Sequence, residues 1–342
     1  MTPPSSIAYT LVPSPMHTLE GHPENAVRFS GLRSIVDGPL GGRLIPLDPI
    51  PAETEALIAV HPTAYLEALR QACAQGPGYI DYAPTYVTPQ SYACALDAAG
   101  GTLQVLQAIV SGKVERGFAL VRPPGHHATA TRAMGFCLLN NIAIAARWAQ
   151  TARLRRVMIV DFDVHHGNGT QEIFEADPQV LYVSTHQEGI YPGTGFAHET
   201  GVGDGLGSVI NIPLPPRAGD SNFLQVFRQI INPAGMRFGP DLILVSAGFD
   251  AHWRDPLAQL QLSCQGYHAL TALLVSLSEQ TSGKIMFVLE GGYDPEALAG
   301  GVEAVMGALA GNPPTPDPIG PAPFPEPDIG RLIGRIVETH NL

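Results

Sequence analysis

Five short apolar runs alternate with longer helix-like stretches along the chain. The apolar runs cover residues 118–121, 157–160, 180–183, 242–245 and 285–289. They are nearly continuous in hydrophobic character, which is typical of strands that are buried on both faces of a parallel sheet. Helix-like stretches occupy residues 92–110, 141–151, 222–237 and 264–281. This alternation predicts one α/β domain, with an open, mostly parallel sheet and helices on both faces.

The C-terminal part of the chain has a different pattern. Residues 312–327 contain eight prolines, which excludes a helix or a central strand and predicts an extended surface segment. Residues 329–340 fit a short last helix. We therefore assign residues 1–311 to a single domain and residues 312–342 to a proline-rich C-terminal segment.

Composition and charge narrow the class of partner. The chain has 342 residues, of which 45% are hydrophobic and 15% charged, so it can bury a large core and is not of the disordered type. Its net charge of −12 repels a phosphate backbone, so no direct contact with nucleic acid is expected. Cationic partners, including lysine-rich peptides and polyamines, are favoured.

Cysteine usage and the first residues bear on the compartment. The four cysteines form no C-x-x-C pair, and so few in a chain of this length favour a reducing compartment over a disulfide framework. Residues 1–15 contain no basic residue and no long apolar run, so we expect neither a signal peptide nor a membrane-spanning segment. The expectation is a cytoplasmic protein without a membrane partner, and an oligomer is compatible with the sequence.

Conspicuous polar motifs follow four of the predicted strands at their carboxyl ends. They are Arg-Pro-Pro-Gly-His-His from residue 122, Asp-Phe-Asp-Val-His-His-Gly-Asn-Gly from residue 161, Ser-Ala-Gly-Phe-Asp from residue 246 and Glu-Gly-Gly-Tyr from residue 290. In open parallel sheets, ligands bind outside the carboxyl ends of the strands. We therefore expect these four loops to aim their polar groups at one site.

The motif that begins at residue 161 indicates a metal site. If the strand continues that far, Asp161, Asp163 and His165 share one face because side chains alternate with period two. Two carboxylates beside an imidazole are costly to bury without a cation, and Asp250 can supply a third ligand. Three protein ligands leave an open position, as in catalytic sites. The alternative is that these residues only cap turns and helices.

Adjacent histidines and a tyrosine supply candidates for proton transfer and charge stabilisation. His126 and His127 follow a stiff Pro-Pro-Gly lead-in, and one imidazole can act as general base and acid while the other assists. Tyr293 follows two glycines and can donate its hydroxyl to a developing oxyanion. The simpler interpretations are hydrogen bonding at a turn for the pair and loop cover for Tyr293. For the segment that holds His17, His22 and Arg28, the simple interpretation is a surface loop entering a helix.

The combined motifs resemble those of the histone deacetylase family, which includes acetylpolyamine amidohydrolases and acetoin-utilisation proteins. Tyr-Pro-Gly-Thr-Gly from residue 191 joins the four motifs above, and the resemblance runs from residue 17 to residue 309. It is of the class II-like, prokaryotic lysine deacylase type. It implies an arginase/deacetylase-like fold with the active site at the carboxyl ends of the strands, and a zinc-dependent amidohydrolase.

The resemblance also implies a role for individual residues. Zinc would be bound by Asp163, His165 and Asp250. The residues implied in catalysis are His126, His127, Asp161, Asn168 and Tyr293, with His127 as general base and then general acid. The residues implied to bind substrate, chiefly along a narrow channel, are His22, Gly135, Phe136, Tyr191 and Leu257. A structural potassium ion is implied near Asp161, Asp163, His165, Ser184 and Thr185.

Some positions depart from the family pattern. Asn168 replaces the aspartate of class I enzymes, so His127 would have an amide partner. Tyr191 stands where phenylalanine is usual and adds a hydroxyl to the channel wall. Leu257 occupies a position where glutamate would favour cationic polyamines, so leucine favours peptide acyl-lysine. Asp81 is near the position of the aspartate that clamps the substrate backbone, but its loop does not align cleanly.

The resemblance extends to arginase-like enzymes at the level of fold, and these hold two metal ions. Two carboxylate positions of that pattern are Gly167 and Gly248 here, which favours a one-metal site. Because the donor set is rich in oxygen, iron(II), cobalt(II) or manganese(II) could replace zinc. The expected reaction is removal of an acyl group, chiefly acetyl, from lysine in peptides or proteins. The alternatives are an amidohydrolase of acetylpolyamines or other small acylated amines, and a non-catalytic acyl-lysine binder.

Overall fold

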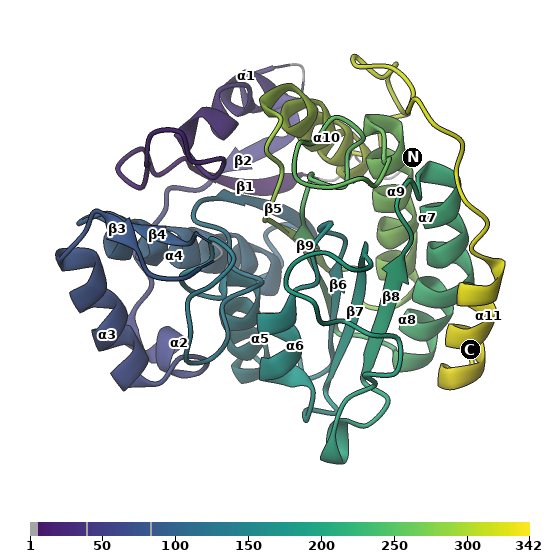
Figure 1. Ribbon diagram of the computed structural model, residues 1–342, viewed down its shortest axis with the longest axis horizontal. Helices are drawn as coiled ribbons and strands as arrows, with labels where there is room; N and C mark the ends of the chain where they lie inside the picture. Colours follow the sequence, from purple (N-terminus) through teal and green to yellow (C-terminus); the bar gives the residue numbers. More distant parts are fainter. Residues whose placement is uncertain (1–5, 39, 83) are drawn as a thin grey trace.

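An eight-stranded parallel sheet forms the centre of the protein in the computed structural model, which describes residues 6–38, 40–82 and 84–342. The strands are β1 (Ile7–Val12), β2 (Leu44–Pro46), β5 (Arg116–Val121), β6 (Val157–Asp161), β7 (Val180–Gln187), β8 (Val209–Leu214), β9 (Leu242–Ala247) and β10 (Ile285–Leu289). Their order is β2-β1-β5-β10-β9-β6-β7-β8, and every neighbouring pair is parallel. The predicted α/β sheet is confirmed (Figure 1).

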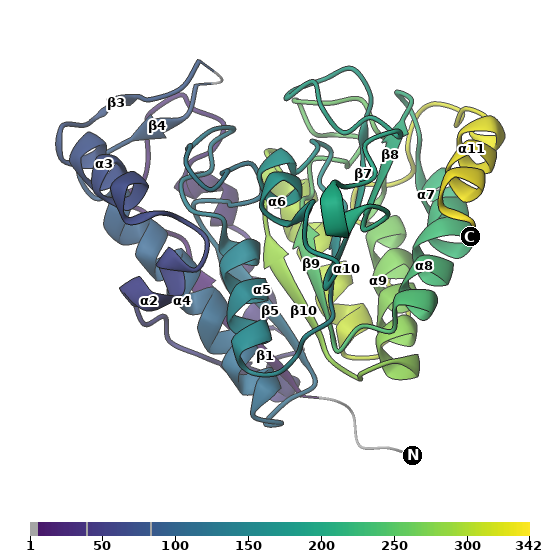
Figure 2. The same cartoon turned by 90° about the horizontal axis from the view of Figure 1, so that it is seen from below.

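Helices cover both faces of this sheet (Figure 2). One face is covered by α2 (Thr54–Ile58), α3 (Thr63–Ala74), α4 (Ser91–Val110), α5 (Asn141–Thr151) and α6 (Asn168–Phe174). The other face is covered by α1 (Leu32–Val36), α7 (Asp220–Val226), α8 (Asn232–Phe238), α9 (Cys264–Gln280), α10 (Pro295–Leu309) and α11 (Gly330–His340). Phe118 packs on the second face and its neighbour Ala119 on the first. Both faces of the sheet are covered by apolar side chains. Because each strand is buried on both sides, its sequence is a nearly continuous run of hydrophobic residues.

Helix boundaries follow local capping chemistry. At the start of α5, the side chain of the N-cap residue Asn140 accepts a hydrogen bond from Ala143 N. At the start of α10, the N-cap residue Asp294 accepts hydrogen bonds from Glu296 N and Ala297 N, and Pro295 occupies the first helical position. The helix predicted over 222–237 is instead three consecutive pieces, because a π-helical turn at Phe227–Ile231 joins α7 to α8. By length and composition α4 could span a membrane, but 67% of its apolar window is buried, as in a core helix.

Three strands of the sheet were not predicted from the sequence. They are β1, β2 and β8, and each is short or mixed in pattern. Strand β1, second from one edge of the sheet, has the sequence Ile-Ala-Tyr-Thr-Leu-Val and pairs with β5 along its whole length. A small antiparallel hairpin, β3 (Gly78–Tyr79) with β4 (Tyr86–Val87), lies outside the sheet. The pairing of such segments depends on distant partners, which a local hydrophobic pattern does not show.

The proline-rich segment crosses the surface in extended form and is held by side chains of the domain. Residues 312–327, all within the described part, contain no helix or strand. The Glu326 carboxylate accepts from Ser221 N at 3.0 Å and Asn222 N at 2.7 Å, at the start of α7. The Trp253 indole donates to Gly320 O at 3.2 Å. The chain ends in α11, within the range predicted for a last helix.

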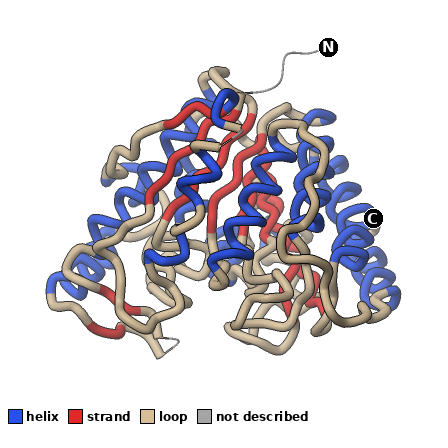
Figure 3. The backbone as a smooth tube through the Cα atoms, turned by 90° about the horizontal axis from the view of Figure 1, so that it is seen from above, coloured by secondary structure: helices blue, strands red, loops and turns tan. Residues whose placement is uncertain are grey.

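The strands place their carboxyl ends at one edge. Asp161, at the end of β6, lies opposite Ser246 of β9 and Ser184 of β7, and Val288 of β10 also lies opposite Ser246. The loops that follow the strands therefore gather at one end of the molecule, as Figure 3 shows. All four motifs that the sequence analysis singled out lie there.

Candidate active site

Two carboxylates and an imidazole meet at this edge of the sheet. Asp163 and His165 come from the loop after β6, and Asp250 from the loop after β9; one ligand atom from each lies within 4.8 Å of the others. His165 Nδ1 is 3.3 Å from Asp163 Oδ1 and 3.2 Å from Asp250 Oδ2. The three residues of the predicted metal set are therefore together.

Main-chain amides orient the two carboxylates. Gly291 N donates to Asp163 Oδ2 at 2.8 Å, and Val164 N donates to Asp250 Oδ1 at 3.0 Å. The remaining oxygen of each carboxylate faces His165. Burial by itself lowers the pKa of His165, but its hydrogen bonds to Asp163 and Asp250 outweigh burial and raise it to about 10. The group thus strongly favours a positive charge at its centre.

The sequence argument for this grouping was wrong in one respect. It depended on the condition that the strand continues to His165, whereas β6 ends at Asp161. Asp163 and His165 are therefore brought together by a loop and not by the alternation of a strand. Asp161 does not join them; its Oδ2 lies 3.0 Å from His126 Nδ1. Phe162, between Asp161 and Asp163, points into the core and is fully buried.

The adjacent histidines each have a separate partner. His126 Nδ1–H donates to Asp161, while His127 Nδ1 is 2.8 Å from Asn168 Oδ1. Because an amide oxygen only accepts, His127 carries its proton on Nδ1 and its Nε2 has a free lone pair. Burial lowers the pKa of His127 well below the usual value, and the positive neighbours His126 and His165 lower it further. His127 is therefore a neutral imidazole able to accept a proton.

Aromatic side chains surround this imidazole and the candidate metal group. The Tyr191 ring lies edge-on to His127, with centroids 5.1 Å apart, and 6.4 Å from the His165 ring. Phe136 lies edge-on to Tyr293 at 5.8 Å. Gly135 has a φ of +55°, and a Cβ there would lie 2.4 Å from the His127 ring, so only glycine lets the Phe136 loop approach this closely.

Tyr293 is held in place by residues that are distant from it in sequence. Its backbone N–H donates to Asp255 Oδ2 at 2.6 Å, and the Arg28 guanidinium lies 4.8 Å from its ring centroid. Arg28 also donates to Gly292 O and to Glu290 O, each at 2.6 Å. The Glu-Gly-Gly-Tyr loop is thereby held on both sides.

The remaining members of the predicted substrate set are His22 and Leu257. His22 is buried, with its Nε2 3.0 Å from Pro84 O and its ring 4.7 Å from that of Phe136, so it supports Phe136 from behind. Leu257 is 37% exposed, and its N–H donates to Asp255 Oδ1. The simple interpretation of the segment with His17, His22 and Arg28 as a surface loop is wrong, because all three side chains are buried.

Residues of the predicted potassium set lie beside the metal group. Asp161, Ser184 and Thr185 are fully buried on adjacent strands. The Thr185 hydroxyl is 3.4 Å from Asp161 O, and Asp163 N donates to Asp161 Oδ1 at 3.2 Å. These positions bring several oxygen atoms together beside the metal group.

The two positions that carry further carboxylates in the two-metal pattern are closed to a side chain here. A Cβ on Gly248 would lie 2.1 Å from Asp163 Oδ2, and one on Gly167 would lie 2.1 Å from Asp161 Oδ2. Neither position can therefore carry the carboxylate that the two-metal pattern requires. A separate cluster of His252, Cys264 and Asp317 is explained by hydrogen bonding, since His252 Nδ1 accepts from Arg254 N and its Nε2 keeps the proton.

Sequence reasoning missed two carboxylates that organise the site. Asp255 links the loop after β9 to Tyr293, as described above. Glu290 accepts from Gly125 N at 2.6 Å and His126 N at 3.0 Å, and so positions the histidine pair. Glu290 opens the Glu-Gly-Gly-Tyr motif noted above and Asp255 lies two residues before Leu257, but the partners of both carboxylates lie far away in sequence. The sequence left the role of Asp81 open. In the structure its Oδ1 forms an ion pair with Arg132 Nη2 at 2.9 Å.

Comparison with known proteins gives a consistent family. Residues 22–309 match the histone deacetylase domain. The chloroplastic histone deacetylase 10 of Oryza sativa subsp. japonica is 40% identical over 90% of this chain and 74% of its own length. A histone deacetylase-like amidohydrolase of Pseudomonas aeruginosa is 39% identical over 80% of this chain and 73% of its own length.

An archaeal relative and a solved structure extend the match. A probable deacetylase of Methanothermobacter thermautotrophicus is 41% identical, over 90% of this chain and 91% of its own length. The crystal structure of the HDA15 HD domain superposes with a TM-score of 0.89 at 34% identity, and covers 98% of this chain and 95% of that one. The predicted arginase/deacetylase-like fold is confirmed, and the chain belongs to the histone deacetylase family of deacetylases and amidohydrolases.

Proposed function

We propose that this chain is a zinc-dependent amidohydrolase that removes acyl groups, chiefly acetyl, from the ε-amine of lysine in peptides or proteins. The observation that carries the proposal is the group Asp163, His165 and Asp250 placed beside the neutral imidazole of His127. Three ligands and an adjacent base make up the components of metal-assisted amide hydrolysis. The family to which the chain belongs supports the same reaction.

The donor set fits a divalent cation. Three converging donor atoms, two of them anionic, match a catalytic zinc site that keeps one position open. Hydrogen bonds from Gly291 N and Val164 N orient the two carboxylates, and Asp163 Oδ1 and Asp250 Oδ2, the oxygens next to His165, would hold the cation. Iron(II) or cobalt(II) are alternatives because two of the three ligands are oxygen. For the nearby oxygen-rich position at Asp161, Ser184 and Thr185, we propose a potassium ion.

Protein groups around the cation would carry out the proton transfers. A divalent cation held there supplies the Lewis acidity that polarises the amide carbonyl and activates the attacking water. His127 Nε2 takes the proton of that water and returns it to the leaving amine nitrogen, while Asn168 keeps the imidazole in the required tautomer. The Tyr293 hydroxyl donates a hydrogen bond to the carbonyl oxygen as negative charge develops on it. His126, paired with Asp161, adds positive charge nearby.

An assay of hydrolysis tests this proposal directly. A panel of acetyl-lysine and longer acyl-lysine peptides is compared with N-acetylated diamines and polyamines, and metal content is measured on the same sample. We expect cleavage of the peptides that is lost with a chelator and restored by zinc. Cleavage of the polyamines alone would contradict the lysine substrate and favour a small acylated amine. No turnover from a metal-loaded protein would contradict catalysis and favour an acyl-lysine binder.

A further inference from the structure

The amide group of Asn168 has to be held in one of two orientations if His127 is to act as a base. An amide has one oxygen, which accepts hydrogen bonds, and one NH2 group, which donates them. With Asn168 Oδ1 at 2.8 Å from His127 Nδ1, the imidazole carries its proton on Nδ1 and keeps Nε2 free. If the amide turns over, Nδ2 faces the imidazole, Nδ1 becomes the acceptor and the proton moves to Nε2. The base is then lost.

His127 itself does not select between these two orientations. The imidazole can donate through Nδ1 to the amide oxygen, or accept at Nδ1 from the amide nitrogen, so it forms one hydrogen bond in either case. A carboxylate in place of the amide would need no selection, because both of its oxygens accept. An asparagine therefore needs a second neighbour that distinguishes its oxygen from its nitrogen.

The thioether of Met134 is such a neighbour. Asn168 Nδ2 donates to Met134 Sδ at 3.5 Å, and Nδ2 has no other acceptor in the described part of the chain. A thioether sulfur can accept a hydrogen bond but has no hydrogen to donate, so it pairs with the amide nitrogen and not with the amide oxygen. Met134 is buried, which strengthens this contact by excluding water. The sulfur thus favours the orientation in which Oδ1 faces His127.

A tight turn places the sulfur beside Asn168. Met134 N donates to Cys137 O at 3.1 Å, and Cys137 N donates to Met134 O at 2.9 Å. The two residues between them, Gly135 and Phe136, have φ values of +55° and +69°, as in the type I′ turns that close hairpins. The turn that brings Phe136 to the imidazole therefore also holds the Met134 side chain next to the partner of that imidazole.

The main chain around Asn168 is fixed against the loop that carries the two histidines. At the start of α6, Thr170 N donates to His126 O at 3.1 Å. Gly169 lies so close to the same loop that a Cβ there would be 2.2 Å from Ala128 O. Because packing sets the two backbones, rotation of the Asn168 amide is the freedom on which the thioether contact acts.

We propose that Met134 is a positioning residue, whose thioether fixes the orientation of the Asn168 amide and thereby the tautomer of His127. This inference rests on the proposed function, because the tautomer matters for proton transfer in that reaction. Its test needs a variant that keeps the packing and removes the acceptor. Met134→Leu meets this condition, since leucine has a similar volume and no lone pair.

The first measurement is the tautomer of His127 in the zinc-loaded protein. Nitrogen NMR of isotope-labelled histidine distinguishes a protonated ring nitrogen from one with a free lone pair, and the His127 signal is identified by its loss in His127→Gln. At a pH where this imidazole is neutral, the wild type should carry the proton on Nδ1. In Met134→Leu the ratio of the Nδ1–H to the Nε2–H tautomer should fall on the order of tenfold, because the hydrogen bond that selects the orientation is lost.

The second measurement is turnover of an acetyl-lysine peptide at the same pH. Only the Nδ1–H tautomer can accept a proton on Nε2, so kcat of Met134→Leu should fall by about twofold to fivefold with KM unchanged. In the Asn168→Asp background the same substitution should leave kcat as it is in Asn168→Asp alone, because a carboxylate accepts in either orientation. The two substitutions are therefore expected to be coupled.

Two controls separate the sulfur from the packing. Met306, on α10, is also fully buried in the core, and Met306→Leu should keep the tautomer ratio and kcat of the wild type. Norleucine incorporated at the methionine positions replaces each sulfur with a methylene group and keeps the length of the side chain. It should shift the tautomer ratio of His127 as Met134→Leu does.

The outcomes that would overturn the proposal are distinct from failure of the proposed function. An unchanged tautomer ratio in Met134→Leu would exclude the role of the thioether. An equal loss of kcat with and without Asn168→Asp would also exclude it, because Met134 would then act by packing and not through the amide. Absence of peptide turnover in the wild type would contradict the proposed function instead, and the tautomer ratio would still decide the role of Met134.

Discussion

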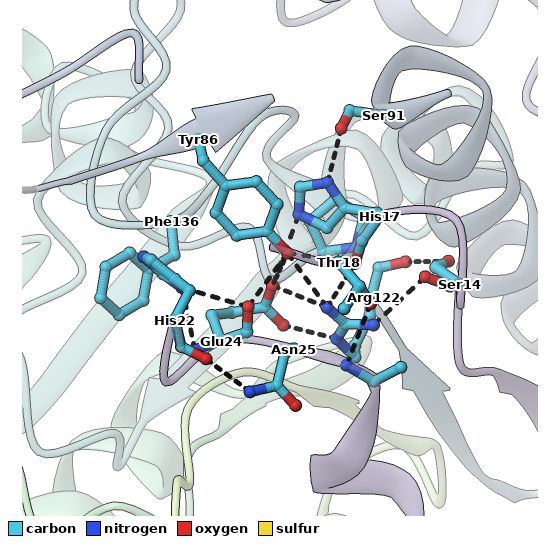
Figure 4. A network of polar contacts seen from close by, with 12 residues as sticks. Ser14, His17, Thr18, His22, Glu24, Asn25, Tyr86, Ser91, Arg122 and Phe136 are labelled. Atoms are coloured by element: carbon cyan, nitrogen blue, oxygen red, sulfur yellow. Dashed lines mark hydrogen bonds and ion pairs between the residues drawn. The ribbon is translucent and has the colours of Figure 1, made fainter. Parts of the chain in front are cut away.

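Two buried clusters of charge lie in this protein, and they differ in how completely they are paired. In the first, Glu24 is bound by Arg122 through Nε at 2.6 Å and Nη2 at 2.9 Å, and by Arg28 at 3.1 Å. Figure 4 shows how His17 and Tyr86 close around the same carboxylate. In the second cluster, Asp163 and Asp250 share the single imidazole of His165, at 3.3 Å and 3.2 Å, and otherwise accept hydrogen bonds from main-chain amides, with His126 Nε2 further away at 3.8 Å from Asp163. Both clusters are almost inaccessible to solvent.

This difference distinguishes a cluster that stabilises the fold, the scaffold, from a cluster that would bind an external partner, the site. Arg122 also donates to Ser14 O and His17 O, so the Glu24 cluster satisfies its charges with its own groups and main chain. Under the proposed function, a divalent cation would compensate the carboxylates of the second cluster. A buried charge that is fully paired inside the protein holds the fold, and one that is incompletely paired indicates an external partner. The following variants test this distinction.

The largest effect is expected from the incomplete cluster. In Asp250→Asn the side chain keeps its shape but loses a charge, so the cation should be bound much more weakly. Hydrolysis should fall on the order of ten-thousandfold, with a matching loss of bound metal measured by elemental analysis. Asp177→Asn, which alters an ion pair with Arg147 on the surface, is the control and should retain metal and activity. A fully active, metal-loaded Asp250→Asn would contradict the role of the cluster.

The complete cluster should respond in stability and not in metal binding. Glu24→Gln leaves two buried guanidinium groups without their carboxylate, and the free energy of unfolding should fall by about 3–5 kcal/mol. Denaturant titration measures this loss, while the folded fraction should still bind one metal ion. If Glu24→Gln lost its metal and kept its stability, the division between scaffold and site would be wrong.

The pH dependence of stability sharpens the same contrast. Burial alone would raise the pKa of Glu24, but Arg122 and His17 hold it well below its usual value. A depressed pKa in the folded state means that Glu24 contributes stability above its unfolded pKa and loses it as the pH falls. The difference in unfolding free energy between the wild type and Glu24→Gln should therefore shrink as the pH is lowered from neutrality into the acid range.

A smaller loss is expected when the oxyanion donor is removed without touching the metal. Tyr293→Phe should lower kcat on the order of a hundredfold to a thousandfold. Metal content and peptide affinity should persist, because the ring and its contacts with Arg28 and Phe136 remain. Equal activity of Tyr293→Phe and the wild type would exclude the assigned role of the hydroxyl.

The smallest change concerns the partner of the general base. Asn168→Asp places a carboxylate beside the Nδ1–H of His127. Its negative charge stabilises the protonated imidazole and raises the pKa of His127. The base is then protonated up to a higher pH, so the acidic limb of the kcat/KM profile should move upward by about one unit. A limb that stays in place would show that His127 is not the group titrating there. Asn141→Asp, on the neighbouring helix start and bonded to Pro123 O, tests whether any added charge has this effect.

The sheet was predictable to the extent that its strands are long and apolar. The five runs that became β5, β6, β7, β9 and β10 are each buried on both faces, so local hydrophobicity was sufficient to find them. β1 and β8 lie in the same sheet but were missed, since a mixed sequence becomes a strand only beside the correct neighbour. The π-helical turn at Phe227–Ile231 was also invisible, because an irregular turn leaves the helical pattern unchanged.

The candidate site was predictable in its members and not in its geometry. Asp163, His165 and Asp250 were identified from motifs, yet the reason given for their grouping assumed a strand that ends two residues before Asp163. Asp255 and Glu290 were overlooked because their function is to hold main-chain amides of distant loops. Such contacts leave no local signal in the sequence.

The sequence by itself determined the α/β class, the edge of the sheet at which polar loops gather and the residues that could bind a metal. These follow from local hydrophobicity and from chemically distinctive side chains at strand ends. The tertiary structure alone decided that Glu24 is satisfied by two arginines, while Tyr191 and Asp81 each keep an atom that finds no partner in the described part of the chain. Pairing depends on which groups from distant segments come within about 3 Å of one another, and only the packing of the whole chain sets those distances.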